Sequence, residues 1–428
     1  MRKRKIISKI RNILKPLKWF YPGMRVKRWL LLSFIGVIMI VAGGQFLSGP
    51  TPVFRMVGII YMLVGIIVIF FGMRKMVASF ITIFLPEHEQ DLVDIVYQKR
   101  HLSKGHRIAA IGGGTGLSVL LHGLKRHTSN ISAIVTVTDE GGSSGKLREE
   151  FGILPPGDIR NCLVALADTE PLMSDLFQYR FDGGSSALQG HSFGNIFLLA
   201  MSKVTKDFEE AVKESSKILA ISGQVIPSTL EKVRLLAEFE DGTKELGETR
   251  VSKNQKPIKR ISLIPLHSKA TNSATEAIKA SEVVILGPGS LYTSVIPNLL
   301  VDGISDAIYN SSAIKIYICN VMTQAGETDN YKASDHIKAL LDNTKLGKVD
   351  YVIVNNAGVP KELLAKYQEK QAYPVEPDAE NIRAMGITPI EDNVIDARDY
   401  VRHNPNRLAK AIVDIISIAK TEAAHQEY

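Results

Sequence analysis

Two apolar stretches near the start of the chain are each long enough to cross a bilayer. Residues 29–47 (WLLLSFIGVIMIVAGGQFL) carry no charge, and residues 53–73 (VFRMVGIIYMLVGIIVIFFGM) carry only Arg55, close to the intervening turn. At about 1.5 Å of rise per residue, a helix of this length covers the hydrocarbon core of about 30 Å. The segment SGPTP between them is rich in helix breakers. The pattern therefore predicts a transmembrane hairpin within residues 29–75.

Basic residues flank this hairpin on both sides. Residues 1–28 hold eleven Lys or Arg and no Asp or Glu, and Arg74 and Lys75 follow the second stretch. Because positive charge stays in the cytoplasm, both termini are expected there, on a multi-pass protein of the cell (inner) membrane. The arm 1–28 also suits anionic lipid. A secretory signal is disfavoured, since no small-residue cleavage site follows; a buried soluble hairpin is the other alternative.

Beyond a linker at residues 76–105, apolar runs and amphipathic runs alternate through residues 106–428. This alternation predicts an α/β, Rossmann-like domain with a mostly parallel sheet and helices on both faces. Residues 227–266 differ, because they are charged and turn-rich, and we expect an antiparallel β-rich excursion there. Strands are predicted at 107–111, 133–138, 283–286, 314–319 and 351–354, and helices at 117–125, 161–167, 195–204, 208–219, 292–298, 332–342, 361–366 and 405–419.

The net charge of +8 is a local property of the N-terminal arm. Without its eleven bases the chain holds 41 Lys or Arg against 44 Asp or Glu. A nucleic-acid-binding body should carry basic stripes on the fold itself, so nucleic acid is not an expected partner. The two cysteines, Cys162 and Cys319, have no metal-binding spacing, and we expect two buried reduced thiols.

A glycine-rich loop, Gly112–Gly116 (GGGTG), follows the first predicted strand of the domain and precedes a helix. Glycine lets backbone N–H groups approach an anion closely, and the helix N-terminus adds partial positive charge. No Walker A lysine follows, and Leu117 stands where the dinucleotide fingerprint GxGxxG needs its last glycine. The loop predicts a phosphate site; the alternative is a plain strand–helix turn.

Two further strand ends carry related chemistry. The second strand ends in TDEGGSSGK. Its acids Asp139 and Glu140 could bind a divalent cation such as Mg²⁺ or ribose hydroxyls, and Ser143 and Ser144 could donate to phosphate. A later strand ends in Gly287-Pro-Gly289-Ser290. Ligands of open α/β sheets bind outside the carboxyl ends of the strands, so these loops predict one nucleoside diphosphate site. Arg160 and His191 are additional candidates for phosphate binding and acid–base chemistry, with helix capping and a structural histidine as their alternatives.

The segments IGGGTGLSVLLHGLK, VTVTDEGGSSGKLREEFGILPPGDIRNCLVALAD, LQGHSFGNIFLLAM and LGPGSLYTSVIPNLLV resemble the YvcK family of gluconeogenesis factors, related to the CofD-like phospholactate transferases. The resemblance runs from about residue 107 to 419. It departs from the family at Glu140, where a second Asp is usual. It implies a Rossmann-like core, binding of UDP-N-acetylglucosamine, and a role in cell shape and wall-precursor supply during gluconeogenic growth. The hairpin lies outside the usual soluble form and is expected to be an added anchor.

The resemblance also carries over individual binding residues. Tyr373 in AYPVEPD would stack on uracil and Arg402 in VRHNP would pair with the diphosphate. The full set is Gly112, Gly113, Gly114, Thr115, Gly116, Asp139, Ser143, Ser144, Asn195, Gly287, Gly289, Ser290, Tyr373 and Arg402.

Three functions are weighed on this basis. The first is a nucleotide-sugar-binding regulator, anchored in the bilayer through residues 29–75, with wall-synthesis proteins as candidate partners. The second is a CofD-like transferase using a guanosine diphosphate donor, with Mg²⁺ on Asp139, the one candidate catalytic residue. A dehydrogenase ranks last because the fingerprint breaks at Leu117, so no nicotinamide cofactor is expected. A homo-oligomer is compatible with the sequence, which does not give the oligomeric state.

Overall fold

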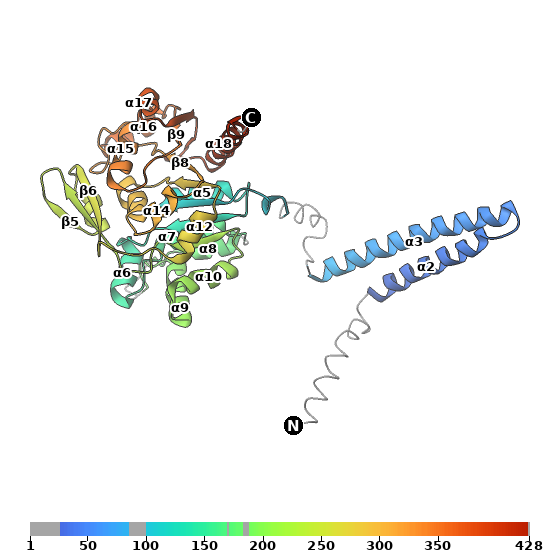
Figure 1. The fold of residues 1–428 in the computed structure, drawn as a ribbon. Coiled ribbons are helices and arrows are strands. Elements are labelled where there is room, and N and C mark those ends of the chain that lie inside the picture. The colour runs from blue at the N-terminus through green and yellow to red at the C-terminus, as the bar shows by residue number, and fades with distance from the viewer. Residues whose placement is uncertain (1–25, 85–99, 169–170, 183–187, 427–428) are drawn as a thin grey trace. The chain divides into compact units, whose positions relative to one another are not determined.

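The computed structural model describes residues 26–84, 100–168, 171–182 and 188–426 (Figure 1). The chain divides into two compact units, residues 1–99 and 100–428. Each unit is described by itself. The predicted basic arm 1–28 lies almost entirely outside the described residues, and so do residues 85–99, half of the predicted linker.

The first unit is a hairpin of two long helices, α2 (Val26–Leu47) and α3 (Pro52–Phe84). Both are long and apolar enough to cross a membrane. Their outer faces expose large apolar side chains, such as Leu31 at 63% and Phe70 at 70%. Such a surface suits a lipid solvent better than water.

Glycines recurring every seven residues line the contact between α2 and α3. A Cβ added at Gly36 would lie 2.8 Å from the Gly65 carbonyl oxygen, and one added at Gly43 would lie 2.8 Å from that of Gly58. Backbones approach closely only where no side chain separates them, which is how small residues mediate helix contacts in membranes. This stripe, continued by Gly72 beside Ser33, lets the two helices pack directly against each other.

A seven-stranded parallel sheet forms the centre of the second unit, in the order β10-β9-β8-β7-β1-β2-β3. The chain adds strands outward from β1 to β3, returns to place β7 beside β1, and then adds strands on the other side. The topological switch point, where such sheets bind ligands, therefore lies between β1 and β7. The strands are β1 Ile108–Gly112, β2 Ile131–Val135, β3 Gln224–Pro227, β7 Val283–Leu286, β8 Ile314–Ile318, β9 Tyr351–Asn355 and β10 Thr388–Asp392.

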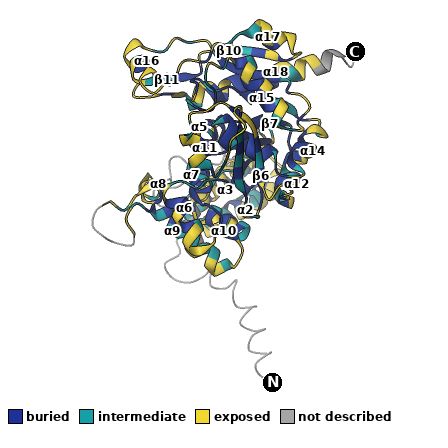
Figure 2. Ribbon diagram, turned by 90° about the vertical axis from the view of Figure 1, so that its left-hand side faces the viewer, coloured by how far each residue is buried: buried dark blue, intermediate teal, exposed yellow. Residues whose placement is uncertain are grey.

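Every residue of β1 and of β7 is buried. Because successive side chains of a strand point to opposite faces, both faces of the sheet must be covered. Figure 2 shows the buried strands between helices, with exposure concentrated on the outer helix surfaces. The helical elements are α5 Gly114–Leu124, α6 Gly142–Phe151, α7 Gly157–Leu166, α8 Pro171–Gln178, α9 Phe193–Thr205, α10 Phe208–Ile218, α11 Glu248–Lys253, α12 Asn272–Ala280, the π-helix η2 Leu291–Val295, α13 Ile296–Leu299, α14 Ile304–Tyr309, α15 Ala333–Asn343, α16 Lys361–Gln368, α17 Ala379–Ala384 and α18 Pro405–Gln426.

The antiparallel excursion is confirmed as a three-stranded sheet of β4 (Arg234–Phe239), β5 (Lys244–Leu246) and β6 (Ile258–Ile264), ordered β5-β4-β6. Figure 1 shows it at one side of the α/β body. Its start differs from the prediction, because Pro227 belongs to β3 of the main sheet. A small hairpin of β11 (Ile395–Ala397) and β12 (Val401–His403) precedes α18.

All five predicted strands are confirmed, but both edge strands, β3 and β10, escaped prediction. Each has four or five residues and includes a proline, so neither shows a long apolar run. The predicted helix at 292–298 is also modified, since it opens with a π-helix before α13.

Candidate functional site

The two glycine loops that leave β1 and β7 meet at the switch point. A Cβ added at Gly116 would lie 2.6 Å from the carbonyl oxygen of Pro288, so only glycine permits this contact. Gly114, the first residue of α5, has a φ of +63°, which also favours glycine. The backbone of Gly113–Gly116 therefore lies against the backbone of Pro288 and Gly289. A glycine loop that leads into a helix N-terminus, as this one leads into α5, suits a phosphate group.

Two adjoining cavities open at these loops and share Thr115, Gly116, Gly289 and Ser290 on their walls, together with Met322, Gln324 and Tyr367. We call the smaller one, of about 250 Å³, the apolar chamber, and the larger one, of about 530 Å³, the polar chamber. The apolar chamber is completed by Val119, Pro288, Asn320, Val321, Val401, Arg402 and His403. The polar chamber is completed by Gly113, Gly114, Glu248, Ser252, Thr293, Ser294, Thr323, Ala325, Glu327, Lys370 and Ala372.

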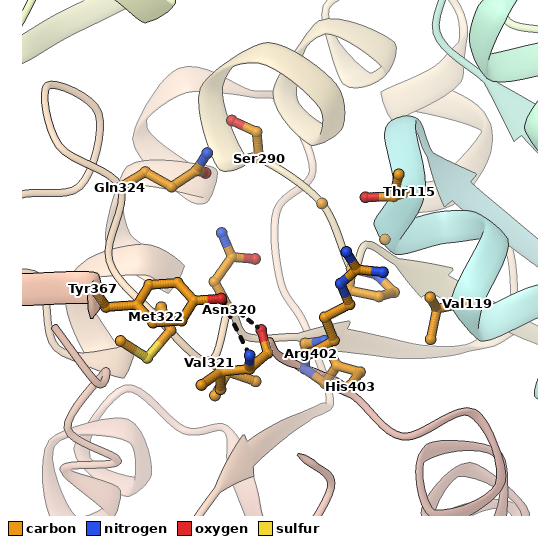
Figure 3. Close-up of a pocket in the computed structure, with 14 residues that line it drawn as sticks. Thr115, Val119, Ser290, Asn320, Val321, Met322, Gln324, Tyr367, Arg402 and His403 are labelled. Atoms are coloured by element: carbon orange, nitrogen blue, oxygen red, sulfur yellow. Dashed lines mark hydrogen bonds between the residues drawn. The ribbon is translucent and has the colours of Figure 1, made fainter. Parts of the chain in front are cut away.

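Figure 3 shows the apolar chamber, with Thr115 and Val119 of α5 on one side and Tyr367 of α16 on the other. Arg402 of β12 extends into it, and its guanidinium lies 5.0 Å from the ring centre of Tyr400. The Tyr367 hydroxyl accepts a hydrogen bond from the Val401 amide (3.1 Å) and donates to the Val401 carbonyl (3.4 Å). α16 and the β11–β12 hairpin are thereby joined around one wall of the chamber.

Two carboxyl groups line the polar chamber. Glu327 is buried, and burial raises the pKa of its carboxyl. It accepts a short hydrogen bond from the Ser290 hydroxyl, which orients the side chain of the second glycine loop. Glu248, the first residue of α11, is partly buried, and its burial, followed by the nearby charge of Asp139, raises its pKa to about 7.

The third predicted loop lies near the polar chamber without lining it. Asp139 accepts a hydrogen bond from the Gly141 amide at 2.8 Å, within its own loop. Glu140 forms an ion pair with Arg234 of β4, with its Oε1 2.7 Å from Nε. Among the described residues there is no group of three or more His, Cys, Asp and Glu placed to hold a metal ion. The Mg²⁺ assignment of Asp139 stays a prediction.

Ser143 and Asn195 belong to a separate buried cluster at the starts of α6 and α9. The Ser143 hydroxyl lies 3.0 Å from Nδ1 of His191 and accepts a hydrogen bond from the side-chain amide of Asn195 at 3.0 Å. Ser144 is buried beside Gly157. Arg160 donates to the Ser192 hydroxyl at 2.5 Å. Ser143, Ser144, Arg160, His191 and Asn195 are absent from the walls of both chambers.

The structure thus brings together part of the predicted set. Gly113, Gly114, Thr115, Gly116, Gly289, Ser290 and Arg402 line the chambers, whereas Gly112 and Gly287 lie directly behind the loops at the ends of their strands. Tyr373 is 45% exposed and lines neither chamber, although its backbone amide donates to the Thr323 hydroxyl.

Several side chains at this site were not predicted from the sequence, among them Tyr367, Glu248 and Asp158. The Asp158 carboxyl lies against Gly113 and accepts a hydrogen bond from the Gly114 backbone amide. Burial, followed by repulsion from Asp139, raises its pKa to about 7. The position of Asp158 in the PPGD turn is the only sequence feature that could have indicated its role. Tyr367 and Glu248 lie in ordinary amphipathic or charged segments, which give no such indication.

Comparison with known proteins places this site in a family. The family described as 2-phospho-L-lactate transferase CofD matches residues 108–395. The gluconeogenesis factor of Bacillus subtilis (strain 168) is 47% identical over 311 residues, covering 72% of this chain and 98% of that protein. A crystal structure of a UPF0052 family member from Bacillus halodurans has a TM-score of 0.70 and 48% identity, covering 72% of this chain and 99% of that one.

The N-terminal region also has counterparts. A Nostoc sp. (strain PCC 7120) protein that carries the gluconeogenesis factor name is 45% identical over 420 residues, covering 92% of this chain and 91% of its own length. The alignment leaves out only 8% of the chain, so it extends well into residues 1–105. The two Bacillus relatives are shorter, because 98% and 99% of their lengths align with only 72% of this chain. The relatives therefore differ in whether they have a counterpart of the N-terminal region.

Proposed function

Since this chain belongs to the CofD-like gluconeogenesis factor family, we propose that it binds a nucleotide sugar, UDP-N-acetylglucosamine, at the two chambers. The contact of the two glycine loops at Gly116 and Pro288 carries the proposal. A diphosphate held there would receive hydrogen bonds from the backbone of both loops and from Thr115, and charge from Arg402. The chambers on either side would receive the nucleoside and the sugar.

The proposed role is that of a regulator, which binds the nucleotide sugar and adjusts cell shape and wall-precursor supply during gluconeogenic growth. The family resemblance supports this role. The apolar hairpin of α2 and α3 supports anchoring in the cell membrane. The basic residues on both sides of it, such as Arg74 and Lys75, support a cytoplasmic position of the α/β domain. Anchoring would place a sensor of a wall precursor beside membrane-bound wall synthesis.

A CofD-like transferase is the second candidate. It is favoured by the family match over residues 108–395 and by the carboxyl groups of Asp139 and Asp158 near the first glycine loop. If Mg²⁺ binds, Asp139 is the residue that would hold it and the cation would neutralise a diphosphate donor.

Calorimetric titration of residues 100–428 with UDP-N-acetylglucosamine and with GDP, each with and without Mg²⁺, tests the proposal. This fragment forms one compact unit, and the solved relatives consist of the same region alone. Tight binding of the uridine ligand, with no nucleotide breakdown in the same mixture, supports a regulator. Preference for GDP, or Mg²⁺-dependent breakdown, supports the transferase, and no binding of the uridine ligand removes the first proposal.

A further inference from the structure

The two chambers beside the glycine loops differ in chemistry. Apolar side chains make up much of the apolar chamber, including Val119, Val321 and Val401. Hydroxyl and carboxyl groups make up much of the polar chamber, including Ser252, Thr293 and Glu248. The flat faces of a base suit the first kind of wall, and a ring bearing several hydroxyl groups suits the second.

Only one acid on the chamber walls is available to a ligand among the residues that the structure describes. Glu327 is almost completely buried and accepts hydrogen bonds from the Ser290 hydroxyl, the Tyr292 amide and the Ser252 hydroxyl, so most of its acceptor positions are occupied within the protein. Asp139 and Glu140 bond to Gly141 and to Arg234 and do not line the chamber. Glu248 lines it and accepts a backbone hydrogen bond from Glu140, whereas a carboxylate has about four acceptor positions.

We propose that the polar chamber holds the sugar of the bound nucleotide and that Glu248 recognises its hydroxyl groups, with the base in the apolar chamber. This inference rests on the proposed function and adds an orientation and a specificity-determining residue to it. It also assigns a role to the antiparallel excursion, because α11, which carries Glu248, connects β5 to β6 along the chain.

Contacts with the third loop hold the excursion in place for this role. Arg234 of β4 pairs with Glu140 at 2.7 Å, and Arg148 of α6 donates to the Val233 carbonyl at 2.7 Å. Gly247, directly before Glu248, packs against the Glu140 carboxylate, where a side chain would clash. The position of Glu248 is therefore determined from both sides, by its own sheet and by the loop after β2.

The test uses residues 100–428 and two ligands, UDP and UDP-N-acetylglucosamine. Glu248→Gln retains an acceptor for the Glu140 amide, so it preserves the local fold, and Glu248→Ala removes the side chain. We expect Glu248→Ala to lower the affinity for the sugar nucleotide by about 10- to 100-fold and the affinity for UDP by less than about twofold. The affinity of Glu248→Gln for the sugar nucleotide should lie between those of the wild type and Glu248→Ala. Glu245→Gln, a matched charge change on β5 outside both chambers, should leave both affinities unchanged.

Two results would overturn the inference while leaving the proposed function intact. The first is an equal loss of affinity for UDP and for the sugar nucleotide in the Glu248 variants, which would place the carboxylate beside the nucleotide. The second is no loss for either ligand. Failure of the wild-type fragment to bind the sugar nucleotide is a different result, and it would remove the proposed function itself.

Val119→Phe tests the orientation independently. This change adds a ring to the wall of the apolar chamber, where the base is placed, and it leaves Glu248 untouched. We expect the affinities for UDP and for the sugar nucleotide to fall to the same extent, by about tenfold or more. A loss confined to the sugar nucleotide would reverse the assignment of the two chambers.

Discussion

Glu140 and Arg234 join the loop after β2 to the antiparallel excursion, with Oε1 and Nε 2.7 Å apart. A second contact of 3.5 Å, between Oε2 and the Nη2 nitrogen, makes the pair close to bidentate. The family resemblance leads us to expect Asp at this position, and the longer Glu side chain of this protein reaches Arg234. This residue therefore acts between two parts of the fold.

Shortening this side chain should loosen the excursion. In Glu140→Asp we expect faster amide hydrogen exchange in β4 and α11, with a loss of folding free energy below about 1 kcal/mol, because Arg234 is 41% exposed. Glu238→Asp, which shortens an ion-paired residue on the outer part of the same sheet, is the control. Unchanged exchange in α11 would show that the pair does not hold the excursion.

Arg402 should contribute strongly to ligand affinity. Arg402→Gln removes the guanidinium from the apolar chamber, so we expect UDP-N-acetylglucosamine binding to fall by about 10- to 100-fold in calorimetry. Arg398→Gln on the same hairpin is the control, because Arg398 pairs with Asp396 at 2.6 Å and lines neither chamber. Equal affinities of the two variants would argue against a ligand contact by Arg402.

Gly116 should not tolerate a side chain. The Cβ of Gly116→Ala would lie 2.6 Å from the Pro288 carbonyl oxygen, and both loops must shift to relieve the contact. We expect a loss of about 1–3 kcal/mol in the free energy of unfolding, measured with urea, together with weaker ligand binding. Gly358→Ala is the matched control, since nothing lies within 4 Å of the added Cβ. If both variants are equally stable, the loops do not depend on this contact.

The carboxyl of Asp158 should make stability depend on pH. Its pKa is raised from 3.8 to about 7, so the folded chain keeps this proton between these values while the unfolded chain releases it. The stabilisation is complete below about pH 4 and is lost as the pH rises through 7.

Asp158→Asn has no such proton to lose, and its side-chain oxygen can still accept the hydrogen bond from the Gly114 amide. Between pH 5 and pH 8 we expect its free energy of unfolding to gain about 1–3 kcal/mol relative to the wild type, measured with urea on residues 100–428. Asp175→Asn, at an exposed position on α8, should show no such gain. A constant difference across this range would contradict a proton held by Asp158.

The glycine stripe should determine whether α2 and α3 form a hairpin. A Cβ at Gly65 would lie 2.7 Å from the Gly36 carbonyl oxygen, so Gly65→Leu should separate the helices. We expect a longer and broader distance between spin labels at positions 31 and 70 of the full chain in detergent micelles. Gly44→Leu adds the same side chain where nothing lies within 4 Å and should leave the distance unchanged. Equal distances in the two variants would show that the stripe is dispensable.

Part of the site was predictable because glycine loops at strand ends have a local signature. Gly112–Gly116 and Gly287–Ser290 are readable one segment at a time, and parallel strands necessarily bring their carboxyl ends to one edge of the sheet. Tyr367 and Glu248 have no such signature, since their positions on α16 and α11 look like those of any amphipathic or charged segment. Ser143 and Asn195 carry polar groups of the right kind, but the fold turns them toward His191 and each other.

The sequence by itself determined the apolar hairpin, the alternation of strands and helices, the antiparallel excursion and the two glycine loops. These features depend on length, periodicity and backbone freedom, which are properties of neighbouring residues. The tertiary structure alone decided that β3 and β10 complete the sheet, that Glu140 forms an ion pair with Arg234, and that Glu248 lines the polar chamber. A carboxylate acts on whichever partner lies within a few ångströms, and long-range packing chooses that partner.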